Sequence, residues 1–242
     1  LGNLLDPEFI TNIISEGTAS TYSETLMSWV GSIESIEANQ GFWLKASEDD
    51  VLLTMVGDKT EITSFDLHYG ANLLSYSCSY SAPITDLVNN LSITDIIGEG
   101  VAATYNPTLG WVGSLSSFEA GKGYWFKADG ATDLSYECPE QQSEEISSYI
   151  SDEDREYIQS TKQAFYFFAN IDGAEEGDVI NAYNGETLVG SRTWFGEFTD
   201  VPAMGKDFQD ETQDYCTEGI TPRFEMVKPD GKLFELEGNL NP

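Results

Sequence analysis

Two stretches of this sequence crowd carboxylates closely enough to bind a metal ion. Each stretch holds four acidic residues: Asp172, Glu175, Glu176 and Asp178 in the first, and Asp207, Asp210, Glu211 and Asp214 in the second. Hard oxygen ligands at this spacing suit calcium, although neither group has the spacing of an EF-hand. The alternative is that both groups are solvated acidic surface. The sequence therefore indicates two candidate calcium sites without requiring either.

Nucleophilic and general acid–base chemistry has much weaker support in the sequence. His68 is the only histidine, and no G-x-S-x-G or histidine-bearing metal motif is present. A pair of glycosidase carboxylates remains open, because 42 acidic residues offer many pairs. We predict a protein that is not an enzyme.

The charge balance excludes several classes of partner. Against 42 Asp and Glu there are 11 Lys and Arg, which gives a formal net charge of −31. Such a surface repels phosphate backbones and anionic lipid headgroups, so we expect no nucleic-acid partner. No run of about 18 apolar residues occurs, so we expect no membrane insertion. The 30 aromatic residues (13 Phe, 12 Tyr and 5 Trp) nevertheless predict a folded chain with a core.

A long internal repeat defines the organisation of the first half. The stretch WVGSIESIEANQGFWLK begins at Trp29, and WVGSLSSFEAGKGYWFK begins at Trp111, 82 positions later. Flanking matches extend the similarity to a tandem module of about 80 residues. The second copy predicts a strand over 70–80, an amphipathic helix over 84–97, and a final hairpin that returns over 124–128. The first copy begins at its helix, so we expect its opening strand to lie upstream or to come from a neighbouring chain.

The last eighty residues show a β pattern without helices. Strands are predicted over 163–171, 179–183, 187–190, 223–228 and 232–236. Asn184-Gly185 and Pro229-Asp230-Gly231 mark hairpin turns. We therefore predict a mainly β protein: repeat module 1 over 1–65, repeat module 2 over 66–139, an acidic linker over 140–162, and a β-sandwich over 163–242. The two repeat modules are expected to be small α+β units.

The three cysteines leave two interpretations open. Cys78 and Cys138 can close a bridge within one repeat, or all three, with Cys216, are buried or free thiols. Their odd number and wide spacing exclude a small disulfide framework and a cysteine zinc site.

Both halves resemble known module types. The pattern NLLSY, WVGSL and EAGKGYWFK resembles the tandem "W-x-G-x-L … G-K-G-Y-W" modules of large exported surface proteins of marine and other environmental bacteria, and of structural proteins of some marine phages. EEGDVINAYNGETLVGSRTW is similar to a "G-D-x-I-x-A-x-x-G-x-x-V-G-x-R-x-W" module of exported bacterial surface proteins. That resemblance implies an immunoglobulin-like or cohesin-like sandwich, and neither resemblance brings catalytic residues.

These observations predict a structural or adhesive segment of a larger extracellular surface, fibre or virion protein. Its expected partners are other copies or neighbouring modules of the same assembly. The alternative is a glycan-binding module of a secreted protein. Trp194 is its candidate ligand-binding residue, because it is the one tryptophan without a repeat partner and its ring can stack on a sugar.

Overall fold

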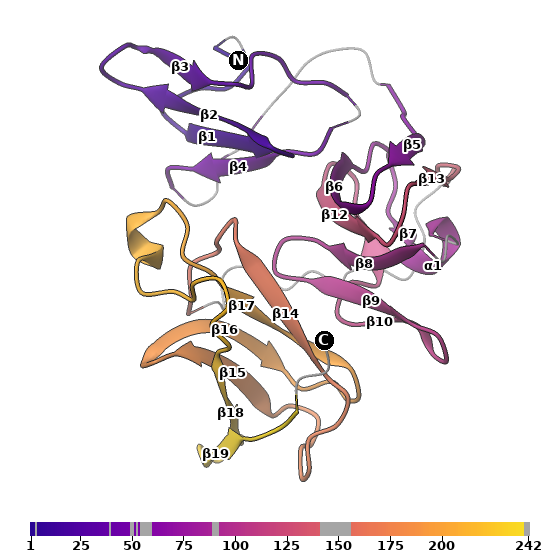
Figure 1. Ribbon diagram of the computed structural model, residues 1–242, viewed down its shortest axis with the longest axis vertical. Coiled ribbons are helices and arrows are strands. Elements are labelled where there is room, and N and C mark those ends of the chain that lie inside the picture. The colour runs from indigo at the N-terminus through magenta and orange to yellow at the C-terminus, as the bar shows by residue number, and fades with distance from the viewer. Residues whose placement is uncertain are drawn as a thin grey trace. The chain divides into compact units, whose positions relative to one another are not determined.

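The computed structural model describes residues 1–2, 4–38, 40–48, 51, 53, 60–88, 92–140 and 156–239 (Figure 1). These residues form a mainly β structure, and the only helices among them are two short ones. The chain divides into two compact units, Leu1–Gly98 with Ser117–Ile146 and Glu99–Ser116 with Ser147–Pro242. The acidic linker predicted over 140–162 lies largely outside the described residues. No helix in the described part is long and apolar enough to cross a membrane.

The first copy of the repeat is a four-stranded antiparallel sheet. Its strands are β1 (Ile10–Ser15), β2 (Thr18–Ser23), β3 (Ser28–Gly31) and β4 (Trp43–Ala46), in the order β3-β2-β1-β4. Leu5, Ile10, Ile13 and Ile33 form its buried core. β4 is an edge strand of this sheet.

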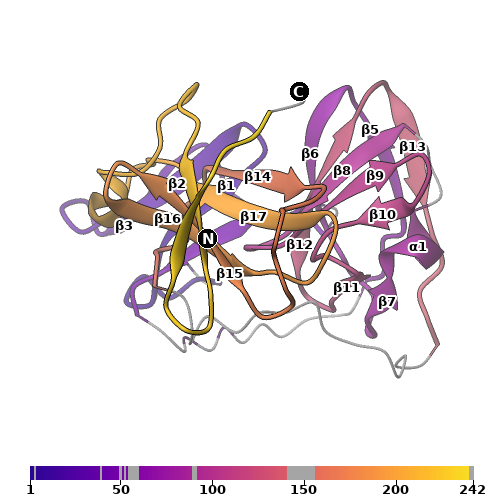
Figure 2. The same cartoon turned by 90° about the horizontal axis from the view of Figure 1, so that it is seen from below.

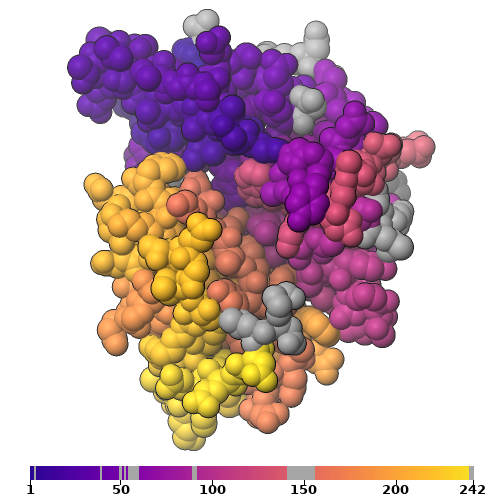
Figure 3. Space-filling view, viewed as in Figure 1, coloured from indigo at the N-terminus to yellow at the C-terminus, as the bar shows by residue number. Residues whose placement is uncertain are grey.

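The second copy uses the same plan and extends it (Figure 1). In the first unit it contributes β5 (Ser64–Leu67), β6 (Gly70–Ser75), β7 (Ala82–Pro83), α1 (Ile84–Leu87), β8 (Ile93–Ile97), β11 (Ser117–Phe118), β12 (Gly123–Ala128) and β13 (Thr132–Ser135). β12 pairs with β8 on one side and with β6 on the other, both antiparallel. β13 pairs with β5, and β11 pairs with β7. The space-filling view shows the first copy in indigo and the second in purple to pink (Figure 3).

The helix expected at the start of the first copy is wrong, because Ile10–Ser15 is strand β1. The helix predicted over 84–97 is wrong beyond its first turn. α1 ends at Leu87, and the segment Ile93–Ile97 is strand β8. The apolar spacing that suggested a helix comes from Ile84, Leu87, Val88 and Leu91, of which Ile84 and Leu87 lie in α1 and Leu91 lies outside the described residues. The pairing of β8 with β12 carries a β-bulge, in which Lys127 lies opposite Asp95 and Ala128 opposite Ile93. Because a bulge adds one residue to the strand, Ile93 and Ile96 both face the core although they are three residues apart. Both are fully buried.

The repeated WVG motif has a steric explanation. Gly31 and Gly113 have φ angles of 148° and 125°, in the region that favours glycine. A Cβ atom on Gly31 would lie 2.2 Å from the Ala19 carbonyl oxygen, and one on Gly113 would lie 2.3 Å from that of Ala102. Each copy therefore needs a glycine where its third strand crosses close to its neighbour.

The second unit contains the β9–β10 hairpin and a two-sheet domain. β9 (Ala102–Asn106) and β10 (Gly110–Val112) are antiparallel. One sheet of the domain pairs β14 (Gln163–Phe168) with β17 (Thr199–Met204), and the two strands run side by side in Figure 2. The other has the order β16 (Thr187–Thr193), β15 (Val179–Asn184), β18 (Arg223–Val227), β19 (Leu233–Leu236). The short 3₁₀ helix η2 (Asp210–Thr212) precedes β18.

Both predicted hairpin turns of this domain are confirmed. β15 and β16 meet at Asn184 and Thr187, and Gly185 has a φ angle of 60°. The turn between β18 and β19 is closed by a hydrogen bond from the Gly231 N–H to the Lys228 carbonyl oxygen, 2.8 Å. The sequence missed β17, whose six residues are all buried and therefore lack an alternating pattern. The immunoglobulin-like arrangement of these strands stays a prediction.

Candidate functional site

The first acidic loop holds a lysine at its centre. Asp178 is buried at the start of the β15 region, and its Oδ2 atom accepts hydrogen bonds from the Lys228 Nζ atom, 2.6 Å, and the Glu175 N–H, 2.7 Å. The same Nζ atom donates to the Gly173 carbonyl oxygen at 2.6 Å and lies 3.8 Å from the Glu175 carboxylate. An ammonium group thus takes the place among these oxygens that a cation would occupy.

The ion pair between Asp178 and Lys228 shifts the pKa of both groups. The hydrogen bond from Lys228 lowers the pKa of the Asp178 carboxyl below its usual value, and the same bond raises the pKa of the Lys228 ammonium. Asp178 stays ionised and Lys228 stays charged over the physiological pH range. The buried carboxylate of this loop is therefore paired with the protein's own lysine.

The second acidic loop is organised around Asp207 as a hydrogen-bond acceptor. Its Oδ1 atom accepts from the Gln209 N–H, 2.9 Å, and the Thr212 hydroxyl, 2.8 Å, and its Oδ2 atom accepts from the Thr161 N–H, 3.0 Å. Burial alone would raise the pKa of Asp207. The donors from Gln209, Thr161 and Thr212 outweigh burial and hold the pKa well below its usual range. The Asp207 carboxylate therefore stabilises the conformation of the second acidic loop.

The other predicted metal ligands do not converge. Asp172, Glu175, Glu176, Asp210, Glu211 and Asp214 are all exposed. Within the described ranges, no three His, Cys, Asp or Glu side chains come together in a way that would hold a metal ion. The structure gives the two calcium sites no support, and calcium binding stays a prediction.

Trp194 lies in the core of the two-sheet domain. It is 6% exposed and packs among Ile180, Val189 and Val201. A ring buried in this way presents no face to a sugar in this structure. The glycan-binding alternative therefore loses Trp194 as a stacking residue, and it stays a prediction that would depend on exposed tyrosines.

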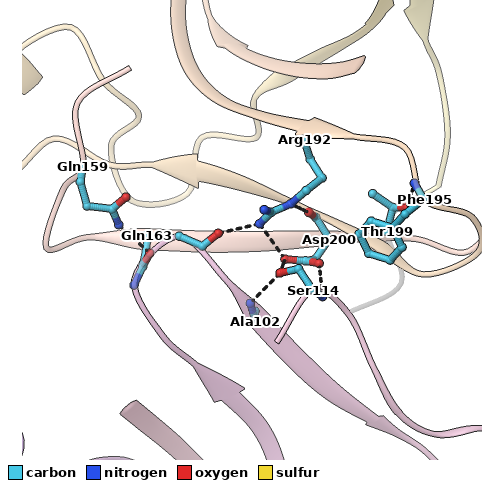
Figure 4. Close-up of polar contacts among 9 residues, drawn as sticks. Ala102, Ser114, Gln159, Gln163, Arg192, Phe195, Thr199 and Asp200 are labelled. Carbon is cyan, nitrogen blue, oxygen red and sulfur yellow. Dashed lines mark hydrogen bonds and ion pairs between the residues drawn. The ribbon is translucent and has the colours of Figure 1, made fainter. Parts of the chain in front are cut away.

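The second unit contains a buried ion pair that the sequence did not predict (Figure 4). The Arg192 Nη2 atom lies 3.1 Å from Asp200 Oδ2, and the two side chains are 3% and 0% exposed. Arg192 also donates to the carbonyl oxygens of Asp200, 2.8 Å, and Gly100, 2.6 Å. Ser114 completes the set with its N–H, 2.6 Å from Asp200 Oδ1, and its hydroxyl, 2.8 Å from Oδ2.

This network ties the β9–β10 hairpin to the strands β16 and β17. Burial raises the pKa of Asp200, while Arg192 and the two donors of Ser114 act in the opposite direction. Both carboxylate oxygens of Asp200 accept hydrogen bonds, so we interpret this network as structural. The only sequence signal was an arginine inside the VGSRTW stretch, at a position that a strand buries.

An aromatic cluster and a disulfide close the second copy. A small cavity between β6, β12 and β13 is lined mainly by aromatic side chains: Phe65, Leu74, Ser75, Tyr76, Phe118, Tyr124, Phe126, Leu134 and Tyr136. Its volume of about 10 Å³ is about what one water molecule needs. Burial raises the pKa of Tyr76 to about 12. Because these side chains leave so little space between them, the cluster is part of the packed core of the second copy.

The disulfide joins Cys78 to Cys138 with a Cα–Cα distance of 5.4 Å, while Cys216 is a free thiol. The bridge within one repeat is therefore confirmed over the alternative of three thiols.

The two copies contact each other directly within the first unit. The Gly41 N–H donates to the Leu73 carbonyl oxygen, 3.1 Å, and the Leu73 N–H donates to the Glu16 carboxylate, 3.2 Å. The Ser75 hydroxyl donates to the Ala38 carbonyl oxygen, 3.1 Å. A Cβ atom on Gly41 would lie 2.8 Å from the Leu74 carbonyl oxygen, so this position needs glycine for the close approach.

His68 and Glu16 form a second link between the copies. The His68 Nδ1 atom lies 2.7 Å from the Tyr69 carbonyl oxygen, and its Nε2 atom contacts the Glu16 carboxylate. Both neighbours are acceptors, so the ring fits best with a proton on each nitrogen. The Tyr69 carbonyl and then the Glu16 carboxylate accordingly raise the pKa of His68.

Comparison with known proteins gives this chain no relative. No family model, no curated protein and no solved structure matches it. The features with the clearest geometry are the packing of the two copies and the exposed edge of β4.

Proposed function

We propose that this chain is a structural or adhesive segment, without enzymatic activity, of a larger extracellular surface, fibre or virion protein. The observation that carries the proposal is the direct packing of two copies of one module through Gly41, Glu16 and Leu73. Modules that contact their neighbours through fixed main-chain bonds stack into extended arrays, in which each repeat contributes its own core and one interface.

The disulfide supports the extracellular part of this proposal. Bridges such as Cys78–Cys138 persist in oxidising compartments and are rare in the cytosol. The net charge of −31 fits an exposed array, because like charges on repeated β modules oppose uncontrolled edge-to-edge association. The resemblance of the WVG and GKGYW motifs to modules of exported surface proteins points the same way. The neighbouring modules of the same assembly are the partners that we propose.

The proposal is tested on intact source cells or particles. We expect a membrane-impermeant protease or biotin reagent to reach the chain without lysis, and we expect Cys78 and Cys138 to resist alkylation until a reductant is added. Cys216, which is free and half-buried, is the internal control for alkylation under denaturing conditions. A chain that is labelled only after lysis, with three reactive thiols, would refute the proposal.

A further inference from the structure

The two copies differ at one sheet edge, and the second copy shows what belongs there. In the second copy, β12 lies between β8 and β6. Its counterpart in the first copy is β4, since Trp43 and Trp125 are 82 positions apart, and β4 pairs with β1 alone. Within the described ranges, the edge of β4 equivalent to the one that β6 covers has no strand beside it.

Two side chains of β4 are exposed where their counterparts in β12 are buried. Leu44 lies opposite Ile13 of the core and is 37% exposed, whereas its counterpart Phe126, opposite Ile96, is 4% exposed. Ala46 is exposed, whereas its counterpart Ala128 is 2% exposed. The core-facing side of β4 is therefore open to solvent at the two positions that are buried in the second copy.

The backbone of β4 is oriented to accept another strand. The Lys45 carbonyl oxygen faces β1, where the Thr11 hydroxyl lies 3.4 Å away. Because backbone groups alternate in direction along an antiparallel strand, the N–H and C=O groups of Leu44 and Ala46 face away from β1. In β6 the same alternation holds: the Leu73 N–H and C=O face the first copy, so those of Asn72 face β12.

We infer that the free edge of β4 binds an extended segment of the β5–β6 type from outside this 242-residue chain, paired antiparallel with Leu44 and Ala46. The register follows from the second copy, where Asn72 lies opposite Phe126 and Gly70 opposite Ala128. The incoming asparagine therefore lies opposite Leu44 and the incoming glycine opposite Ala46. The contact of Gly41 with Leu73 sets the limit of the site at the N-terminal end of β4.

Strand addition of this kind gains affinity from main-chain hydrogen bonds and specificity from alternate side chains. In the second copy the Asn72 side chain is 3% exposed, bonds the backbone of its own turn at His68 and Gly70, and reaches the Phe126 carbonyl oxygen of β12 at 3.4 Å. This inference rests on the proposed function and names the chemistry of its partner: a strand from another module of the same kind.

The test uses the full chain and a synthetic peptide with the sequence of Ser64–Ser75. We expect saturable binding by fluorescence anisotropy, and slower amide exchange at Leu44 and Ala46 in the labelled chain. A peptide N-methylated at Asn72 keeps every side chain but loses the central N–H, and we expect it to bind at least tenfold more weakly.

A matched pair of chain variants locates the site. Leu44→Glu places a charge on the open face, and we expect it to weaken peptide binding at least tenfold. Val30→Glu alters a residue that is 45% exposed on β3, at the opposite edge of the same sheet, and we expect it to leave binding unchanged. If Leu44→Glu does not fold, the exchange measurement on the unmodified chain still decides the question.

Three results would overturn the inference. One is the absence of binding with no change in amide exchange at β4. Another is binding that the N-methylated or a scrambled peptide reproduces. The third is light scattering that shows the chain dimerising through β4 itself, with the dimer lost in Leu44→Glu, because a second copy of the edge would then be the occupant. None of these results bears on surface labelling or on the disulfide, so failure here is distinguishable from failure of the proposed function.

Discussion

The two copies of the repeat share a motif and the antiparallel pairing of β1 with β4 and of β8 with β12, but they differ in how their cores are closed. In the second copy, β6 covers β12, β5 pairs with β13, and a disulfide joins Cys78 to Cys138. In the first copy β4 ends the sheet, and the core-facing Leu44 is partly exposed. The difference shows that the repeated sequence specifies the pairing of β1 with β4 and of β8 with β12, whereas the strand β6 that covers β12 belongs to the second copy alone among the described residues.

The sharpest test of this difference is truncation at the two equivalent positions. Phe126→Ala removes a ring that packs against Phe118, with centroids 5.6 Å apart, from a closed core. We expect a loss of about 3–5 kcal/mol in the local free energy of unfolding. Leu44→Ala removes a side chain that is already 37% exposed, and we expect the local free energy of unfolding to fall by about 1 kcal/mol or less. Hydrogen exchange of the β12 and β4 amides measures each effect in place, and equal losses would contradict the comparison.

A second test uses a serine that both copies contain. Ser114 donates to the buried carboxylate of Asp200, whereas its counterpart Ser32 bonds the backbone of Ala19 and no carboxylate within the described ranges. Asp200→Ala leaves Arg192 buried without its partner, and we expect a loss of about 3–5 kcal/mol in the stability of the second unit. Ser32→Ala is the control, expected to change stability by less than about 1 kcal/mol. Urea unfolding followed by exchange of the β16 and β17 amides distinguishes the two variants.

A third test removes the covalent closure. The double variant Cys78→Ser, Cys138→Ser opens a bridge that spans 60 residues. We expect a loss of about 2–4 kcal/mol, confined to the second copy, because the bridge restricts the unfolded chain of that copy alone. Cys216→Ser is the matched control. Amides of β1 and β2 that lose protection together with those of β8 and β12 would show that the copies unfold as one.

The smallest expected effect concerns pH and the link between the copies. The Tyr69 carbonyl and the Glu16 carboxylate raise the pKa of His68 above 6.5. A raised histidine pKa means that the contribution of this contact is complete below about pH 6.5 and is lost as the pH rises through the raised value. NMR titration of the ring measures the pKa, and Glu16→Gln should lower it. A pKa of 6.5 or less in the unmodified chain would show that the contact does not form in solution.

Local patterns predicted much of the secondary structure. Asn184-Gly185 and Pro229-Asp230-Gly231 located two hairpins, because these residues favour the backbone angles that tight turns need. The 82-residue spacing of Trp29 and Trp111 located the repeat and the return strand of the second copy. The helix over 84–97 failed because the apolar spacing of Ile84, Leu87 and Val88 covers little more than one turn, which forms α1, whereas Ile93–Ile97 pairs with β12 as strand β8.

The roles of the candidate site residues depend on contacts with residues that lie far away in the sequence. Asp178 and Asp207 looked like metal ligands as types, but Lys228 neutralises the first and hydrogen-bond donors surround the second. Trp194 looked like a sugar platform, but it lies in the core. Each of these outcomes depends on which side chain from a distant strand arrives beside the residue.

The sequence by itself determined the duplication, the hairpin turns, the mainly β class and the strongly acidic surface, because these depend on composition and on residues close together in the chain. Only the tertiary structure decided that Cys78 bonds Cys138, that Arg192 and Asp200 form a buried pair, and that β4 ends its sheet in the part of the chain that the structure describes. The physical reason is that pairing between distant strands is set by how complementary faces pack, and a single sequence does not show which faces meet.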